Sequence, residues 1–241
     1  MIEIEVLDAF GDNYIYVVKH GPGVCFAIDP GAAKPVESLV SQRNIQLTHI
    51  FATHHHLDHI GGIEELKKMY GCEVIGPDQQ RISHMDTLAR DGDDFDLGDM
   101  TIHCIATPGH TSTGMCYFMT SNEPQAPVLF TGDTLFVCGC GRLIECDGQT
   151  MFRSLQKIAA LPAETRIYPG HDYTEENLRF ALTLSPENET LKKRLNEVQL
   201  NTRQGHPTVP STIAEEKKCN PFLKTATWQE FSERRKSKDN F

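Results

Sequence analysis

The sequence predicts an α+β protein in which two packed β-sheets are flanked by helices and followed by a helical C-terminal region. Three observations support this fold class. Short apolar runs of strand character, separated by turn residues, fill the first two thirds of the chain. Helical patterns occur between these runs, a mixture that is typical of a layered core. The strand signal stops near Thr174, and helical patterns continue from there.

The expected strands are rich in β-branched and aromatic residues and end at glycine, proline or polar residues. They cover residues 2–7, 14–18, 24–28, 48–52, 72–76, 100–106, 115–119, 128–132 and 166–170. Helices are expected near 35–42, 63–70 and 149–160, then over 174–185, where Thr174 caps the helix, 187–203 and 211–218. We therefore expect one domain of packed sheets and helices over residues 1–172 and a helical domain over residues 173–241.

Composition and charge exclude several classes of protein. The formal net charge of −10 argues against a nucleic-acid-binding protein, because phosphate contacts require basic surface. No apolar run approaches the roughly 18 residues that a membrane span needs, and the N-terminus lacks the pattern of a signal peptide. The eight cysteines show no paired C-x-x-C spacing, so a disulfide framework is not expected. We expect a cytoplasmic protein with neither nucleic-acid nor membrane partners.

Charge is distributed unevenly along the chain. Residues 217–241 carry seven basic residues against three acidic ones, a local balance of +4, whereas the rest of the chain carries −14. The C-terminal segment is therefore a basic island on an acidic protein. Cys138 and Cys140 lie close enough in sequence to suggest a metal or redox pair, although a glycine-rich turn with incidental thiols is the alternative.

The segment THHHLDHIGG, residues 53–62, places four metal-type side chains within six positions. It follows a predicted buried strand, and side chains two apart on an extended segment share a face. His54 and His56 can therefore hold one ion, while His55 points away. Asp58 and His59 lie on the turn into the next helix and can address another ion. Imidazole and carboxylate suit zinc, with iron or manganese as alternatives, and a surface histidine cluster is the non-metal interpretation.

Three further turns present a single ligand-type side chain after an apolar strand. His110 lies in TPGHT, Asp133 in FTGDT and His171 in YPGHD. Glycine in each turn gives the backbone room to aim the side chain. One such histidine would more often be structural, but three turns together with residues 53–62 form a specific pattern for two metal ions.

These segments resemble the metallo-β-lactamase superfamily and, within it, the glyoxalase II family of hydroxyacylglutathione hydrolases. The likeness runs nearly end to end through DNYIYVV, AIDPG, THHHLDHIGG, TPGHTS, FTGDTLFVCGCGR, PGHDYT, PTVPSTIAEEKKCNPFL and RRKSKDNF. The resemblance implies an αββα metallo-β-lactamase-type sandwich with a C-terminal α-helical domain that binds glutathione. The last two segments indicate the subfamily, because generic superfamily members lack this extension.

The resemblance also implies residue roles. One metal would be held by His54, His56 and His110, the other by Asp58, His59 and His171, with Asp133 bridging both. Asp58 and Asp133 are thus the expected catalytic carboxylates, around a metal-bound hydroxide as nucleophile. Glutathione would be bound by Arg142, Tyr173, Arg235 and Lys238, which suits the basic C-terminal segment, since glutathione carries two carboxylates.

The implied reaction is hydrolysis of S-D-lactoylglutathione to glutathione and D-lactate, the second step of methylglyoxal detoxification, by a monomer. The thiolate leaving group has a conjugate acid with a pKa near 8.5, so the reaction needs no strong general acid. The chain departs from many relatives at Thr113-Gly114, Ile144, Cys146-Asp147 and Asp172. None of these is an implied metal ligand, so the departures concern substrate affinity. Asp29 is interpreted as a turn residue, with support of the ligands as the alternative.

Three other functions compete with thioester hydrolysis. A serine or cysteine nucleophile has little support, because the sequence contains no G-x-S-x-G elbow. A mononuclear iron persulfide dioxygenase that acts on glutathione persulfide would use fewer of these ligands. A non-catalytic metal-binding protein would need neither an open coordination position nor basic substrate residues. Metal counting and oxygen dependence separate these alternatives.

Overall fold

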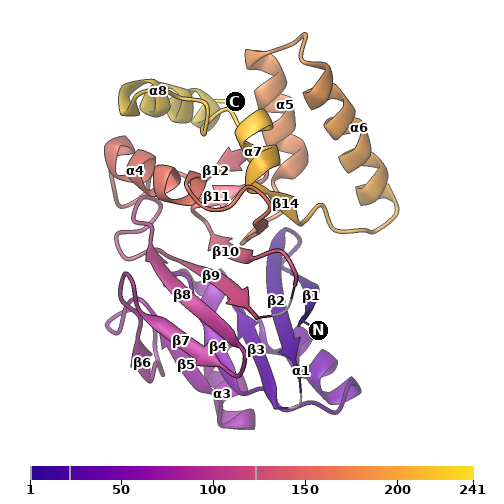
Figure 1. Cartoon of the computed structure of the whole chain (residues 1–241), viewed down its shortest axis with the longest axis vertical. Coiled ribbons are helices and arrows are strands. Elements are labelled where there is room, and N and C mark those ends of the chain that lie inside the picture. The colour runs from indigo at the N-terminus through magenta and orange to yellow at the C-terminus, as the bar shows by residue number, and fades with distance from the viewer. Residues whose placement is uncertain (1, 22, 123) are drawn as a thin grey trace. The chain divides into compact units, whose positions relative to one another are not determined.

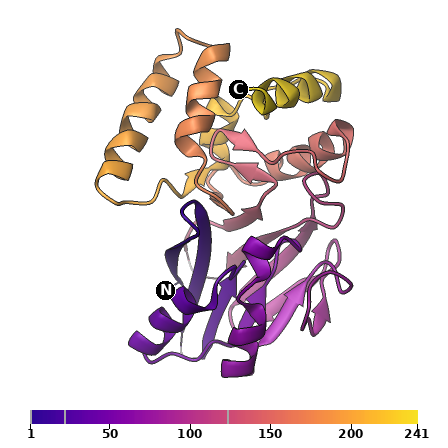
Figure 2. The same cartoon turned by 180° about the vertical axis from the view of Figure 1, so that it is seen from behind.

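The structure is a computed structural model that describes residues 2–21, 23–122 and 124–241. The chain forms two compact units. Unit 1 comprises Met1–Ala106 and Thr113–Gln125, and unit 2 comprises Thr107–Ser112 and Ala126–Phe241. Unit 1 is drawn in indigo to magenta in Figure 1, and Figure 2 shows the same elements from behind. No helix in the described ranges has the length and apolar character needed to cross a bilayer.

Unit 1 contains a six-stranded mixed sheet with its strands in sequence order. The strands are β1 (Ile2–Ala9), β2 (Asn13–His20), β3 (Val24–Ile28), β4 (His49–Phe51), β5 (Glu73–Gly76) and β6 (Thr87–Leu88). β1, β2 and β3 are antiparallel, whereas β3 to β6 are parallel. Because β3, β4 and β5 are parallel, the carboxyl end of β4, just before the histidine motif, lies at the same end of the sheet as the carboxyl ends of its neighbours.

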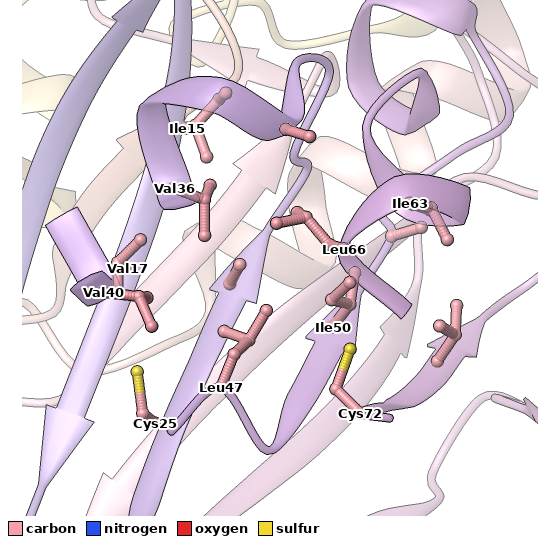
Figure 3. Close-up of a cluster of buried hydrophobic side chains, with 14 of the residues drawn as sticks. Ile15, Val17, Cys25, Val36, Val40, Leu47, Ile50, Ile63, Leu66 and Cys72 are labelled. Atoms are coloured by element: carbon pink, nitrogen blue, oxygen red, sulfur yellow. The ribbon is translucent and has the colours of Figure 1, made fainter. Parts of the chain in front are cut away.

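Helices α1 (Ala33–Gln42) and α3 (Ile63–Tyr70) cover one face of this sheet, with the short α2 (Leu57–Ile60) between them in sequence. Figure 3 shows Val36 and Val40 of α1 and Leu66 of α3 directed toward the strand residues Ile15 and Ile50. All five side chains are buried. Burial of apolar area at roughly 25 cal/mol per Å² is the main source of stability for such a layer.

The other face of the sheet packs on an antiparallel meander within unit 1. Its strands are β7 (Asp94–Leu97), β8 (Met100–Ala106) and β9 (Met115–Ser121). Phe51 of β4 meets Phe95 of β7 and Tyr117 of β9 edge to face, with ring centroids 5.8 and 5.1 Å apart. Two packed sheets, as the sequence predicts, are therefore present in this unit.

Unit 2 combines a small sheet, a hairpin and the C-terminal helices. β10 (Val128–Gly132) pairs in parallel with β13 (Arg166–Pro169), and β14 (Ser211–Thr212) pairs antiparallel with β13. β11 (Leu135–Phe136) and β12 (Gly139–Cys140) form a two-stranded hairpin. The helices are α4 (Gly148–Ala159), α5 (Thr174–Leu184), α6 (Glu189–Arg203), α7 (Ile213–Cys219) and α8 (Trp228–Asp239). Figures 1 and 2 both show α5 and α6 side by side as an antiparallel pair.

Each strand and helix that the sequence predicts occurs near its expected position. The structure also contains elements that are not among those predicted, namely the short α2, the C-terminal α8 and the strands β6, β7, β11, β12 and β14. One detail was wrong. Thr174 does not cap α5 but is its first residue, and Asp172 Oδ1 accepts the hydrogen bond from its amide nitrogen at 3.2 Å.

Candidate metal centre

His54 and His56 lie on the bend between β4 and α2. β4 ends at Phe51, and the two histidines follow it. They meet because His56 has extended backbone angles as the residue that precedes α2, and His54 Nε2 lies 3.1 Å from His56 Nδ1. Two tetrahedral ligands at about 2.0–2.1 Å from one zinc ion are about 3.3 Å apart. The pair therefore has the spacing of two ligands to one ion.

Asp58 and His59 form a second pair on α2. Asp58 Oδ2 lies 3.4 Å from His59 Nε2, again the spacing of two ligands to one ion. Asn13 Nδ2 donates to Asp58 Oδ2 at 2.9 Å and fixes this carboxylate. Gly31 lets the backbone of α2 approach, because a Cβ atom at this position would lie 1.8 Å from the carbonyl oxygen of Asp58.

Asp29 is buried, with an exposed fraction of 2%, and its carboxylate contacts His59 of the second pair. Its carboxylate accepts hydrogen bonds from the Thr53 amide nitrogen at 2.7 Å and the Thr53 hydroxyl at 2.6 Å, and it lies 2.9 Å from His59 Nδ1. A carboxylate on Nδ1 holds the proton there and leaves the Nε2 lone pair for a metal ion. From the sequence, this supporting role is only the alternative to that of a turn residue. The acid at the end of a buried strand, in AIDPG, was the available signal.

Asp29→Asn is expected to weaken metal binding about 10- to 100-fold. The amide nitrogen of asparagine would donate toward His59 Nδ1 and move the ring proton to Nε2, the nitrogen that must coordinate. Competition with a chromophoric chelator measures the affinity. Asp86→Asn, which removes a carboxylate bonded to Lys67, is the matched control and should bind metal as the wild type does. Unchanged affinity of folded Asp29→Asn would contradict the role of Asp29.

Unit 2 brings together His110, Asp133 and His171. Asp133 follows β10, and its Oδ2 lies 3.3 Å from His110 Nε2 and 3.5 Å from His171 Nε2. All three residues are at most 9% exposed. His110 Nδ1 lies 3.0 Å from the carbonyl oxygen of Arg142, which can only accept, so the ring carries its proton on Nδ1 and turns Nε2 toward the carboxylate.

His55 belongs to a different hydrogen-bonded group of unit 1. Arg81 donates toward His55 Nε2 at 3.2 Å and to the Thr113 hydroxyl at 3.2 Å. Arg81 also pairs with Asp78, which accepts from the Thr113 hydroxyl at 3.1 Å. Thr113, one of the departures from relatives, therefore has specific partners among residues that adjoin the histidine motif.

The donor chemistry of both units fits metal ions. In unit 1, Asp29, His54 and His59 offer ligand atoms within 4.8 Å of one another, and in unit 2 one carboxylate oxygen adjoins two imidazole nitrogens. Neutral imidazole and carboxylate are the ligands that zinc, iron and manganese share. The chain thus holds histidine and aspartate clusters that could bind metal ions.

Two of the predicted glutathione-binding residues contact candidate ligands of unit 2, Arg142 through its carbonyl oxygen at His110 and Tyr173 through its ring at His171. Arg142 is exposed, and no ion pair of its guanidinium occurs among the described residues. Tyr173 is half-buried and stacks on His171, with ring centroids 4.9 Å apart and planes at 8°. Tyr173 therefore also supports the imidazole of an expected ligand.

Arg235 and Lys238 lie on α8 and are buried, with exposed fractions of 4% and 8%. Arg235 donates to the Cys140 carbonyl oxygen at 2.7 Å and pairs with Asp239 at 3.0 Å. Lys238 pairs with Glu176, and its ammonium lies over the rings of Phe180 and Phe241. Both cations thus have acidic partners within the chain, which an incoming carboxylate would have to join or displace.

The cysteines of the glycine-rich turn are buried free thiols. Burial raises the pKa of Cys140 to about 11, which keeps this thiol protonated at neutral pH. None of the ligand groups found among the described residues includes a cysteine. The geometry favours the turn interpretation of Cys138 and Cys140 over a metal pair.

Comparison with known proteins extends these observations to the whole chain. Residues 8–171 match the Metallo-beta-lactamase superfamily, and residues 172–241 match the Hydroxyacylglutathione hydrolase C-terminus. A hydroxyacylglutathione hydrolase of Rhizobium etli is 43% identical and covers 100% of this chain and 99% of its own length. That of Pelagibacter ubique is 41% identical and covers 100% of both chains.

Solved structures support the same fold. ETHE1 from Myxococcus xanthus has a TM-score of 0.72 at 26% identity and covers 98% of this chain and 90% of its own. A metallo-β-lactamase from Staphylococcus aureus has a TM-score of 0.73 at 20% identity, with 97% and 66% covered. The chain has the metallo-β-lactamase fold with a helical C-terminal region. It belongs to the hydroxyacylglutathione hydrolase family of the metallo-β-lactamase superfamily.

Proposed function

We propose that this chain hydrolyses S-(2-hydroxyacyl)glutathione thioesters such as S-D-lactoylglutathione to glutathione and a 2-hydroxy acid such as D-lactate. The observation that carries the proposal is full-length similarity to hydroxyacylglutathione hydrolases in a chain with two imidazole–carboxylate clusters. In the cell this reaction would be the second step of methylglyoxal detoxification. The catalytic domain would cover residues 1–172 and the glutathione-binding helical domain residues 173–241.

The proposed metal ligands follow the pairs that each unit forms. His54 and His56 would join His110 on one ion, and Asp58 and His59 would join His171 on the other, while Asp133 would bridge both. The donor set favours zinc, with iron or manganese as alternatives. Such ions lower the pKa of a bound water and polarise a carbonyl oxygen. Asp58 and Asp133 contribute the negative charge that balances two dications.

The remaining chemistry falls to the substrate and to the residues that orient it. Water adds to the thioester carbonyl carbon, the C–S bond breaks, and the glutathione thiolate leaves. The conjugate acid of this thiolate has a pKa of about 8.5, so no strong acid is needed at the sulfur. Arg142, Tyr173, Arg235 and Lys238 would bind the glutathione portion through its carboxylates and peptide groups. The eight free thiols suit a reducing compartment, which supports a cytoplasmic location, and we propose a monomer.

A spectrophotometric assay with metal analysis tests the proposed function. Purified protein should consume S-D-lactoylglutathione, measured as loss of thioester absorbance in the ultraviolet, under anaerobic conditions. Elemental analysis should find two metal ions per chain. One iron per chain, with oxygen consumption on glutathione persulfide and no thioester hydrolysis, would instead support the persulfide dioxygenase. Full metal loading without turnover of any acyl thioester would support a metal-binding protein.

A further inference from the structure

The hairpin of β11 and β12 connects residues of the candidate metal centre within unit 2. Asp133 lies two residues before it, and Arg142, whose carbonyl oxygen faces His110 Nδ1, lies two residues after it. Residues 135–141 are all buried. Two-residue strands have few ladder hydrogen bonds of their own, so such a hairpin depends on its surroundings for a fixed position.

Side chains from three C-terminal helices bond the hairpin backbone at five consecutive residues. Asn220, just after α7, donates to the carbonyl oxygens of Phe136 and Gly139 at 3.3 and 2.9 Å. Asn177 of α5 donates to the Val137 carbonyl oxygen at 3.1 Å, and Glu216 of α7 accepts from the Cys138 amide nitrogen at 2.7 Å. Arg235 of α8 completes the set at Cys140.

The side chains of α5 and α7 in this set are themselves buried, and Glu216 and Asn220 are bonded to each other. Glu216 and Asn220 are fully buried, and Asn177 is 4% exposed. Asn220 Nδ2 also donates to Glu216 at 3.0 Å, and the Ser211 hydroxyl donates to the same carboxylate. Arg194 lies 3.7 Å from Glu216 and offsets its charge. A buried polar network whose members are all bonded holds one geometry, because each alternative leaves a buried group unsatisfied.

The position of the hairpin is coupled to the ligand side chains. The Gly141 amide nitrogen donates to the Thr134 carbonyl oxygen at 3.3 Å, which closes the loop behind Asp133. A Cβ atom on Gly141 would lie 1.9 Å from the Asp133 carbonyl oxygen and 3.2 Å from His110 Cβ. A shift of the hairpin would therefore move Asp133 and also the carbonyl group that orients His110.

We infer that Asn177, Glu216 and Asn220 are positioning residues through which the C-terminal helices hold the hairpin and, with it, Asp133 and His110 in metal-binding geometry. The C-terminal region then has a structural role in the metal centre that is separate from glutathione binding. The inference rests on the proposed function in so far as that function assigns Asp133 and His110 to the metal ions. The inference predicts that metal affinity depends on residues of the C-terminal helices that are not candidate metal ligands.

Zinc affinity of the full-length protein, measured by competition with a chromophoric chelator, tests the inference. Asn177→Ala and Glu216→Ala should each bind zinc about 10- to 100-fold more weakly than the wild type. Glu216→Gln retains an acceptor for the Cys138 amide and should bind within about twofold of it. Excess zinc should restore the turnover of Asn177→Ala, with the KM for the thioester unchanged, since this variant leaves α8 intact.

Leu191→Ala is the matched control, because Leu191 is buried on α6, which packs on α5, and makes no hydrogen bond to the hairpin through its apolar side chain. Thermal unfolding of the apoproteins shows which variants fold. If Glu216→Ala does not fold, the zinc affinity of Asn177→Ala alone tests the inference. Wild-type affinity in folded Asn177→Ala, or an equal loss in Leu191→Ala, overturns the inference. A wild-type protein that binds no divalent ion contradicts the proposed function as well.

Discussion

Asp133→Ala is expected to lower kcat/KM for S-D-lactoylglutathione by about a thousandfold or more, which corresponds to roughly 4 kcal/mol of transition-state stabilisation. Asp133 is the carboxylate that adjoins the imidazoles of His110 and His171, at 3.3 and 3.5 Å from their Nε2 atoms. Its removal deletes the proposed bridge and half of the negative charge that the two proposed catalytic carboxylates place against two dications. Steady-state kinetics at fixed metal concentration, with elemental analysis of the same sample, measures both consequences.

Asp133→Asn separates the charge of this residue from its shape. The amide retains one oxygen but places an NH₂ group or a neutral oxygen against the histidines, so we expect activity nearly as low as that of Asp133→Ala. Glu189→Gln, a change at an exposed acid on α6, is the control and should keep wild-type activity. Asp133→Ala with wild-type kcat/KM and two bound ions would remove Asp133 from the mechanism.

The candidate metal ligands could be proposed from the sequence because their signals are local. His54, His56, Asp58 and His59 lie within six positions, and His110, Asp133 and His171 each follow a recognisable strand and turn. His54 and His56 follow β4, which ends at Phe51, and they meet on the bend before α2. The spacing in sequence was sufficient, since any extended segment brings side chains i and i+2 to one side.

Features that depend on tertiary contacts could not be predicted from local sequence patterns. Asp29 acts on His59 from 30 positions earlier, and the fold of the sheet determines that contact. The β11–β12 hairpin has only two residues per strand, and its bonds to Asn177 and Asn220 span 40 to 84 positions. Arg235 and Lys238 are charged residues of a type that usually lies at the protein surface. Acidic and aromatic partners allow them to be buried here.

Gly141→Ala is expected to be among the most damaging substitutions outside the candidate ligand set. The added Cβ would lie 1.9 Å from the Asp133 carbonyl oxygen, a backbone atom that no side-chain rotation can move away. The hairpin or the Asp133 backbone must therefore shift by an ångström or more, and a misplacement of about 1 Å can cost roughly 100-fold in rate. We expect kcat/KM and zinc affinity to fall together, and the melting temperature to fall as well, because overpacking costs about 1–3 kcal/mol.

Gly76→Ala provides the comparison for this steric effect. Gly76 is also buried, but its added Cβ would meet only the side-chain ends of Ile82 and Met85 at 3.0 Å, and these can rotate. Its cost should therefore appear in stability and leave kcat/KM within about twofold, since β5 contributes no proposed ligand. Equal activity losses in the two variants would mean that Gly141 matters only for overall stability. Selective loss in Gly141→Ala would tie catalysis to the close approach of the hairpin to Asp133.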